Sequence, residues 1–437
     1  MAANRPPADP VEPTFVDEVR RPCPAVRRRH QEEPVAVALA ATRPAEPFGE
    51  AKQRLANAVE AHRDEILDLS HRIHANPEPA FEERQAATWV AEAIARHGYA
   101  VEHPAGRLET AVRGRLRGGR GGDGPRIGIL AEYDALPGLG HGCGHNTMAA
   151  SGVGAAIALA SVAAELPGEI VFLGCPAEER GSGKQYMLDD GLFGGVDAAL
   201  LFHPNDRTSS SIALLASVDV EVTFTGRQAH AASEPWMGRN ALDALVLLFQ
   251  SIGLWRQQLR PEARVHGIVL EGGTAANIIP SRAVGRFMLR SIDESYFHEI
   301  QDRFREIVQG CALATATQGE ARFSGGSSTM KQNDVLRRRF SGNLVAYGLE
   351  DGPLDLDHLG SSDMGNVSQL LPTIHPYLAI APLDTPGHST AFRDAAATEA
   401  ADDATLLAAT LVAQTAYDLF ADPPLVEAAW AEFRETT

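Results

Sequence analysis

Apolar residues in the segment that starts at Ala51 recur three, four or seven positions apart, which is the spacing of an amphipathic helix. They are Leu55, Val59, Ile66, Leu69 and Ile73. The pattern predicts a helix that ends at Asn76-Pro77, because proline disrupts a continuing helix. A second helix is expected from Phe81 to Gly98, where the glycine suits a helix C-terminus.

Three later segments are mostly apolar and have the length of one buried strand: residues 127–131, 169–175 and 197–202, the last two beginning with Glu169 and Asp197. Residues 148–164, between the first two runs, are small and apolar and predict a buried helix. Further strands are expected within residues 101–116. Strands joined by helical crossovers indicate an α/β fold with a mixed, mostly parallel sheet flanked by helices.

The pattern changes at Ser217, where apolar residues begin to alternate with polar ones. Val218, Val220, Val222 and Phe224 share this period of two, which is typical of a strand with one solvated face. A helix, two strands, a helix and a strand are then expected at residues 240–259, 266–270, 283–290, 294–315 and 321–324. This order describes a two-layer α+β unit. We therefore predict an inserted domain at 213–326 between two parts of a catalytic domain, 48–212 and 327–437.

Residues 1–47 show no sustained apolar period and contain nine of the 27 prolines. Seven arginines balance seven acidic residues there, so the net charge of −18 belongs to the rest of the chain. This composition predicts a disordered or loosely packed tail. A start codon assigned too far upstream explains the segment equally well.

The chain of 437 residues carries 39 basic and 57 acidic residues. The negative balance argues against nucleic acid and an anionic membrane as main partners, and it is compatible with a local basic pocket for a carboxylate substrate. No uninterrupted apolar run reaches the ~18 residues of a membrane-spanning helix, and the short run 35–41 is a poor signal peptide. Four scattered cysteines argue against a disulfide framework. A cytoplasmic location is therefore expected.

Metal-binding residue types occur in the glycine-rich loop that follows the run 127–131. Cys143 and His145 lie two positions apart, and Gly142 and Gly144 let the chain bend tightly enough for their side chains to converge. Thiolate and imidazole suit zinc and its neighbours. The loop is also at the end of a strand, where open α/β sheets bind ligands. A buried free cysteine beside a solvated histidine is the alternative.

Other candidate ligands follow the next two apolar runs and occur in a loop near the C-terminus. Glu178 and Glu179 are adjacent, so one carboxylate can bind a metal while the other faces the attacking water. His203 directly follows the third apolar run, and His388 lies in the C-terminal loop. Taken alone, two adjacent glutamates are more often an acidic, solvated turn than a catalytic pair.

Six motifs occur in order across residues 50–420: GHGCGHNTMAA, CPAEERGSGK, LLFHP, TGRQAHAASEPWMGRNALDA, GGTAANIIP and SSDMGNVSQLLPTIHPYLAIAP. Together they resemble the aminoacylase/carboxypeptidase family of di-metal amidohydrolases, which are metallopeptidases. The similarity is strongest to the branch that contains p-aminobenzoyl-glutamate hydrolase and aminoacylase-like dipeptidases. The resemblance does not cover the tail.

The resemblance implies two divalent metal ions at the carboxyl edge of the sheet. The implied ligands are Cys143, His145, Glu179, His203 and His388. Glu178 matches the family's general acid/base. His230, in GRQAHAA, resembles a histidine of the inserted domain that reaches a partner's active site and stabilises the oxyanion, which implies a homodimer through that domain. Asn277, in AANIIP, resembles a residue near the substrate.

The chain departs from the wider family at one position. Much of that family has a histidine ligand two residues before the aspartate equivalent to Asp134, and Glu132 stands there in this chain. Asp134 is then expected to orient a ligand rather than to bind a metal. His375 lies close to His388 in sequence and is the alternative C-terminal ligand. Softness of the ligands favours zinc, and manganese or cobalt also fit.

These features predict a metal-dependent amidohydrolase or peptidase. It would cut the amide bond of a small N-acyl amino acid, a dipeptide or an aminobenzoyl-glutamate-like substrate, with Glu178 as the base. Hydrolysis of another C–N bond, such as an N-carbamoyl group, is the alternative within this class. A metal-binding scaffold without catalysis is the alternative outside it, and the presence of Glu178 beside Glu179 argues against a scaffold.

Overall fold

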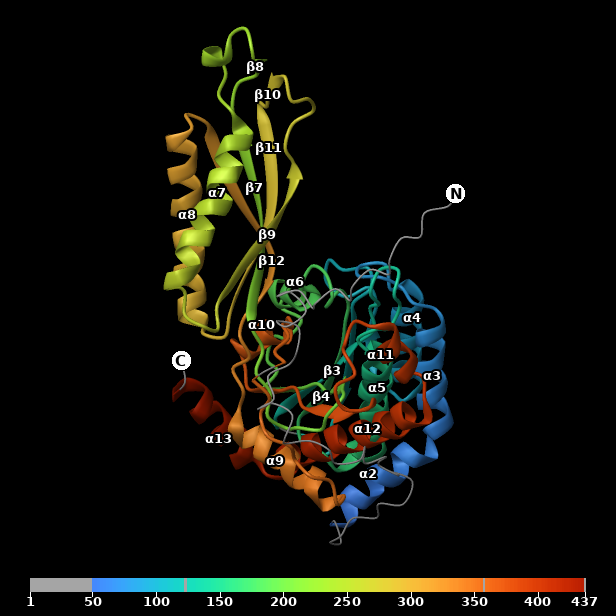
Figure 1. The fold of residues 1–437 in the computed structure, drawn as a ribbon. Coiled ribbons are helices and arrows are strands. Elements are labelled where there is room, and N and C mark those ends of the chain that lie inside the picture. The colour runs from blue at the N-terminus through green and yellow to red at the C-terminus, as the bar shows by residue number, and fades with distance from the viewer. Residues whose placement is uncertain (1–48, 122–123, 357, 436–437) are drawn as a thin grey trace, which may run out of the picture. The chain divides into compact units, whose positions relative to one another are not determined.

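The computed structural model describes residues 49–121, 124–356 and 358–435. The predicted tail lies outside the described residues. The catalytic part contains a six-stranded sheet with the order β1-β2-β4-β3-β5-β13 (Figure 1). Its strands are β1 Ala100–Glu102, β2 Val112–Arg117, β3 Arg126–Glu132, β4 Glu169–Cys175, β5 Ala198–Leu200 and β13 Thr373–Ile374.

The sheet is mixed and mostly parallel, as predicted. β3 runs parallel to β4 and β5, and β5 runs parallel to β13, whereas β2 pairs antiparallel with both β4 and β1. Every residue of β3 after Arg126, and of β4 after Glu169, is buried. Strands that are buried throughout are typical of the centre of such a sheet, which explains why both segments are mostly apolar.

Helix α5, His145–Val162, lies against β3 and β4, contacts α4 Arg84–Arg96, and packs most extensively against three further helices. These are α2 Glu50–Ala61, α3 Arg63–Ala75 and α12 Glu399–Ala421. The small residues of α5 make this close packing possible. A Cβ at Gly152 would lie 2.6 Å from a backbone oxygen of β3, and a Cβ at Gly154 would lie 2.9 Å from the Cβ of Ala409 in α12.

Among the residues that the structure describes, two helices are long and apolar enough to cross a membrane, His145–Glu165 and Glu399–Ala421. Neither helix contains an uninterrupted apolar run of that length, because polar residues interrupt both. The fold buries 83% and 78% of their most apolar windows, and the two helices pack against each other. They are therefore core helices in this fold.

The remaining elements of the catalytic part are short or peripheral. The helices are α4 Arg84–Arg96, α6 Gly183–Asp189, α9 Asp334–Ala346, α10 Met364–Ser368, α11 Thr390–Ala395 and α13 Pro423–Glu435. A separate parallel pair of strands is formed by β6 His203–Asn205 and β14 Tyr377–Ala379. This pair continues the chain from β5, so His203 follows the sheet directly.

The inserted segment forms its own two-layer unit. An antiparallel sheet with the order β12-β7-β11-β9 has helices α7 and α8 on one face (Figure 1). The elements are β7 Ala216–Thr225, α7 Ala241–Trp255, β9 Arg264–Glu271, β11 Arg282–Ser291, α8 Glu294–Ala314 and β12 Gln318–Ser327. A second hydrophobic core between the layers consists of buried residues from 216 to 312. This second core agrees with an inserted domain. The domain boundaries themselves, 48–212, 213–326 and 327–437, remain predictions.

Candidate metal centre

The candidate ligands lie where the central strands end. β3 ends at Glu132, and the loop after it leads into α5, whose first residue is His145. β4 ends shortly before Glu178 and Glu179, and β6 begins at His203. Parallel strands bring their carboxyl ends to one edge of a sheet, so these segments meet there.

Cys143, His145 and His203 offer ligand atoms that all lie within 4.8 Å of one another. The Cys143 Sγ and His203 Nε2 atoms are 3.5 Å apart. Gly144 has a φ of 79° and directly precedes α5, and a Cβ at this position would lie 2.7 Å from the Pro204 side chain. A glycine is therefore needed both for the bend and for the close approach of the loop to β6.

Cys143, Glu179 and His388 form a second set within the same distance limit. The His388 Nε2 atom is 3.5 Å from Glu179 Oε2. The backbone N–H of His388 donates to the carbonyl oxygen of Gly142 at 2.9 Å, which ties the C-terminal loop to the glycine-rich loop. Because Cys143 belongs to both sets, the structure brings all five predicted ligands into one cluster.

Two buried atoms of this cluster face each other without a hydrogen-bond partner among the described residues, His145 Nε2 and Glu179 Oε1. They are 4.0 Å apart, which is too far for a hydrogen bond. Sulfur, imidazole and carboxylate donors together fit a zinc-like divalent cation, so the residues present fit a metal ion.

The charge of the site supports the same conclusion. Five carboxylates have side chains that are at most 9% exposed: Glu132, Asp134, Glu178, Glu179 and Asp363. Lys184 contributes one positive charge against them. Buried carboxylates are costly unless they are paired with positive charge, so bound cations would balance the excess.

Asp134 contacts two of the predicted ligands. Its Oδ1 atom is 3.0 Å from His145 Nδ1, and its Oδ2 atom accepts the backbone N–H of Glu179 at 2.9 Å. Burial by itself raises the pKa of Asp134, but the hydrogen bond and the charge of His145 outweigh it and lower the pKa. This contact directs the other ring nitrogen of His145 toward the cluster, which agrees with the predicted orienting role.

Glu178 lies beside the ligands and extends toward them. Its Oε2 atom is 3.9 Å from His145 Nε2, and Glu132, His145 and Glu178 form a third set of ligand atoms within 4.8 Å of one another. Burial, followed by the charges of Glu132 and Glu179, raises the pKa of Glu178 well above its usual value. A carboxylate with a raised pKa is a stronger base, as proton transfer requires.

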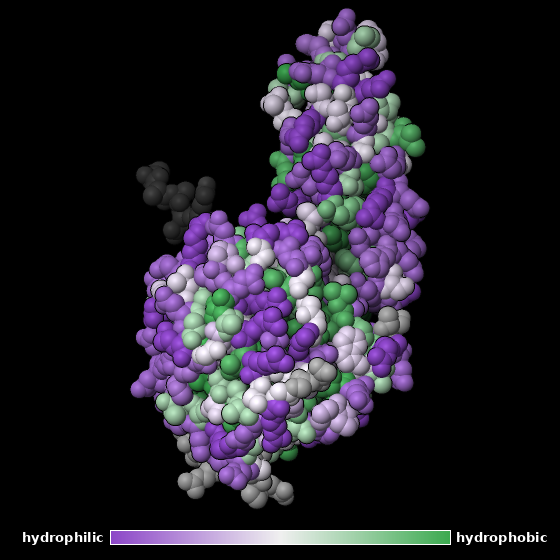
Figure 2. Space-filling view, turned by 180° about the vertical axis from the view of Figure 1, so that it is seen from behind, coloured by the Kyte–Doolittle hydropathy of each residue, from purple (hydrophilic) through white to green (hydrophobic). Residues whose placement is uncertain are grey.

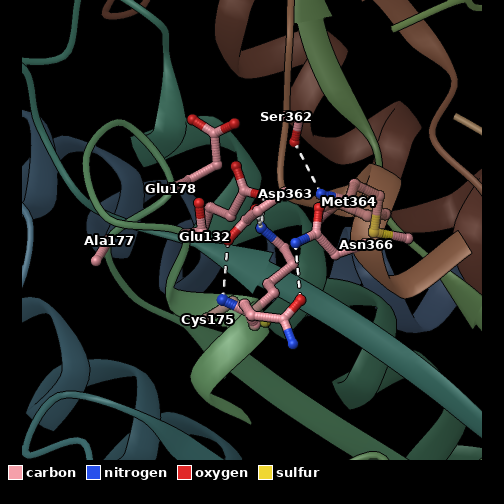
Figure 3. A network of polar contacts seen from close by, with 12 residues as sticks. Glu132, Cys175, Ala177, Glu178, Ser362, Asp363, Met364 and Asn366 are labelled. Carbon is pink, nitrogen blue, oxygen red and sulfur yellow. Dashed lines mark hydrogen bonds and ion pairs between the residues drawn. The ribbon is translucent and has the colours of Figure 1, made fainter. Parts of the chain in front are cut away.

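A buried lysine, Lys184, bridges two of these carboxylates, Glu132 and Asp363. Figure 3 shows both carboxylates close to Glu178. The Lys184 Nζ atom is 2.5 Å from Glu132 Oε1 and makes an even shorter contact with Asp363 Oδ1. The Lys184 backbone N–H also donates to Asp363 Oδ2 at 2.9 Å. Burial alone would lower the pKa of Lys184, but Asp363 and Glu132 raise it, so the lysine stays charged.

Sequence reasoning missed this ion pair. Lys184 and Asp363 both lie inside quoted motifs but received no role there. They are 179 positions apart, so only the folded chain brings them together. One feature of the sequence could have indicated a role for Lys184: it lies at the glycine-rich start of α6, shortly after the pair of glutamates that follows a strand.

Two further histidines lie near the cluster and bond elsewhere. His375, the alternative C-terminal ligand, packs its ring 5.3 Å from that of His203, and its Nδ1 atom is 3.1 Å from the Leu201 carbonyl oxygen. His141 is buried with its Nε2 atom 3.1 Å from the Ile73 carbonyl oxygen. Burial lowers the pKa of each ring to about 3, so both are neutral.

His230 and Asn277 come together at the tip of the inserted unit. His230 ends β8, Ala229–His230, which pairs with β10, Ile278–Ile279, and the Ala231 N–H donates to the Asn277 carbonyl oxygen at 3.0 Å. Within the part of the chain that the structure describes, no hydrogen bond or ion pair joins either residue to the metal cluster. The His230 Nδ1 atom accepts two backbone N–H groups at 3.1 Å each, so its proton is on Nε2, free to donate outward.

Comparison with known proteins identifies related chains over almost the whole length. Xaa-Arg dipeptidase of Mus musculus is 34% identical over 428 residues, which cover 90% of this chain and 96% of that protein. One of the chains of p-aminobenzoyl-glutamate hydrolase from Escherichia coli strain K12 is 30% identical over 463 residues, covering 87% of this chain and 94% of that one. Both bear out the resemblance drawn from the motifs.

A solved structure and a family model agree with these relatives. The Bacillus subtilis YXEP protein, a dinuclear metal binding peptidase from the M20 family, matches the fold with a TM-score of 0.62 at 21% identity, covering 81% of this chain and 99% of that one. The model of peptidase family M20/M25/M40 matches residues 128–435. The chain therefore belongs to peptidase family M20/M25/M40 and is a metal-dependent peptidase or amidohydrolase.

Proposed function

We propose that the chain hydrolyses the amide bond of a small dipeptide or N-acyl amino acid with two divalent metal ions, for which zinc is the best match. Cys143, His145 and His203 would hold one ion, and Cys143, Glu179 and His388 the other. The observation that carries this proposal is the pair of overlapping ligand sets that share one sulfur. The names of the relatives include both a dipeptidase and a p-aminobenzoyl-glutamate hydrolase.

The residues divide the chemistry between them. When bound, the metal ions polarise the scissile carbonyl and lower the pKa of the attacking water. Glu178, within 3.9 Å of His145 Nε2, accepts a proton from that water and returns it to the leaving amine. Asp134 holds His145 and the Glu179 backbone in place through its two oxygens.

Direct assay tests the proposal. The purified protein, loaded with zinc, manganese or cobalt, should release free amine from at least one dipeptide, N-acyl amino acid or aminobenzoyl-glutamate. Exhaustive chelation should remove this turnover, and adding the metal back should restore it, with metal content measured at each stage. Full activity in a preparation shown to be free of metal would overturn the assignment.

We also propose that the chain is a homodimer through the inserted unit. The sheet order places β9 at an edge, where Ile268, Val269 and Leu270 are 60%, 51% and 45% exposed. Figure 2 shows hydrophobic patches on the surface of the inserted unit. An edge strand with exposed apolar residues favours pairing with another strand, and a second copy of this chain offers the same strand.

His230→Ala is expected to lower turnover by ~10²–10³-fold, which is the usual effect of losing one oxyanion donor. The side chain is exposed and bonds within its own hairpin, so folding and metal content should not change. Turnover, circular dichroism and metal content of the variant check this together.

Mixed dimers test whether His230 acts across the dimer. Inactive His230→Ala and inactive Glu178→Gln protomers, unfolded and reassembled together, should regain part of the activity, because one site in each mixed dimer would have both groups intact. Mixed dimers that form and stay inactive would contradict action across the interface.

A further inference from the structure

Glu83 is a buried carboxylate that belongs to none of the candidate ligand sets. It is the residue that directly precedes α4. Its Oε1 atom accepts the backbone N–H groups of Phe81 at 2.9 Å and of Ala177 at 2.8 Å. Its Oε2 atom accepts the hydroxyl of Thr110 at 2.8 Å. The carboxylate therefore ties the segment before α4 to the turn that follows β4.

The two residues whose N–H groups reach Glu83 Oε1 both have a backbone conformation that side chains disfavour. Phe81 has a φ of 66° and Ala177 has a φ of 58°, in the left-handed region that residues other than glycine rarely adopt. Such conformations persist only where the surrounding structure holds them in place. The shared oxygen of Glu83 supplies part of this support, because it fixes the direction of both N–H groups.

The turn at Ala177 carries the two glutamates of the site. Ala177 directly precedes Glu178, and Figure 3 shows both on one loop. The N–H of Glu179, on the other side of Glu178, donates to Asp134 Oδ2 at 2.9 Å. Two buried carboxylates thus hold the backbone around Glu178, with Glu83 before it and Asp134 after it. The directions of both glutamate side chains depend on these two anchors.

A negative charge on Glu83 is not needed for these hydrogen bonds. Burial, followed by the charge of Asp134, raises the pKa of Glu83 to about 7, so the group is partly protonated at neutral pH. The oxygen of a neutral carboxyl or amide group also accepts N–H donors. A neutral side chain of the same length should therefore hold the turn as well as glutamate does.

We propose that Glu83 is a positioning residue for the reaction. It holds the turn at Ala177 so that Glu178 points toward the attacking water and Glu179 toward the metal ions. The inference rests on the proposed function, because both roles belong to that reaction. Without the acceptor the turn would relax from its left-handed conformation, and a displacement of reacting groups by about 1 Å can lower a rate ~10²-fold.

Glu83→Gln and Glu83→Asp separate the position of the acceptor from its charge. Glutamine keeps the length: its amide oxygen can accept both N–H groups, and its NH2 group can donate to the Thr110 hydroxyl. Aspartate keeps the charge but is one methylene shorter, which withdraws the acceptor from the turn.

The two variants are compared by kcat at saturating zinc, with a substrate identified by direct assay, and by zinc affinity, measured by competition with an absorbing chelator. Both quantities should stay near their wild-type values in Glu83→Gln. In Glu83→Asp both should fall ~10–100-fold, the usual scale for groups that orient metal ligands. KM should change little, because the substitution acts on the reacting groups rather than on the substrate.

Thr110→Val is the matched control. Valine has nearly the shape of threonine, and the substitution removes the hydrogen bond to Glu83 Oε2 but leaves the contacts of Oε1 with the turn. The variant should unfold at lower urea concentration, because a buried acceptor loses its partner, while kcat and zinc affinity stay near wild type. A loss of stability alone would then not explain the lower kcat of Glu83→Asp.

The possible failures are distinguishable. Wild-type kcat and zinc affinity in Glu83→Asp would overturn the positioning role and leave the proposed function standing, and so would an equal loss of kcat in Thr110→Val. Glu83→Gln decides the matter even if Glu83→Asp does not fold, since a tenfold or greater loss of kcat in Glu83→Gln would overturn the role. If the zinc-loaded wild-type protein hydrolyses no amide substrate, the proposed function fails, and the zinc affinities alone decide the positioning role.

Discussion

Glu178→Gln should lower kcat by ~10²–10⁴-fold, the usual contribution of a general acid–base group, while the metal content stays at the wild-type level. Glutamine keeps the size of the side chain and removes its ability to accept and return a proton. The prediction depends on the position of Glu178, which is next to the ligand Glu179 but is absent from the two ligand sets that share Cys143.

Glu179→Gln is the matched control one residue away. Its carboxylate lies 3.5 Å from His388 Nε2, and its Oε1 atom is buried without a hydrogen-bond partner among the described residues. This variant should lose bound metal, measured as metal per chain, and its turnover should partly recover at high metal concentration. If Glu178→Gln loses metal and Glu179→Gln keeps it, the two roles are exchanged.

Lys184→Met should lower the free energy of unfolding by about 3–5 kcal/mol, the scale for removing one partner of a buried ion pair. Methionine nearly fills the volume of the lysine stem but leaves Glu132 and Asp363 without their cation. Both carboxylates are at most 1% exposed, so water cannot replace the lost charge. Urea unfolding monitored by circular dichroism measures the change.

Lys52→Met is the control for this prediction. Lys52 pairs with Asp418 at 2.7 Å, and the two side chains are 16% and 12% exposed, so the loss of stability should be smaller. Combining Lys184→Met with Asp363→Asn should recover part of the stability, because one unpaired charge is removed. Equal losses for the two lysines, or no recovery in the double variant, would contradict a buried ion-pair network.

The central strands were predictable because burial on both faces leaves a simple signal. β4 matches the predicted run 169–175, and β3 differs from its run by one residue at each end. The alternation after Ser217 likewise marked β7, whose core-facing residues contribute to the second hydrophobic core. The burial of each of these strands can therefore be inferred from its own residues alone.

Other elements depend on partners distant in sequence. β13 contains only Thr373 and Ile374 and is recognisable as a strand because it pairs with β5. The predicted first helix is divided at His62 into α2 and α3, and the apolar period continues across that break without a proline or glycine. Helix α13 was not predicted, because its pattern follows directly on that of α12.

The candidate site was predictable to a similar extent. Strand-end positions and motifs identified the five candidate ligands and Glu178, and the structure places them together at one edge of the sheet. The roles of these residues, and those of His230 and Asn277, stay predictions. The ion pair between Lys184 and Asp363 was not predictable, because the two residues are 179 positions apart.

Both candidate metal sites depend on the sulfur of Cys143, so oxidation of this one atom would affect both. Cys143 is only half-buried, and it belongs to both ligand sets. In protein depleted of metal, oxidation of this sulfur would remove a donor from both sets in one chemical event. Damage by an oxidant would therefore inactivate the centre as a whole, and a reductant would restore both sites together only while the sulfur has not passed the sulfenic acid stage.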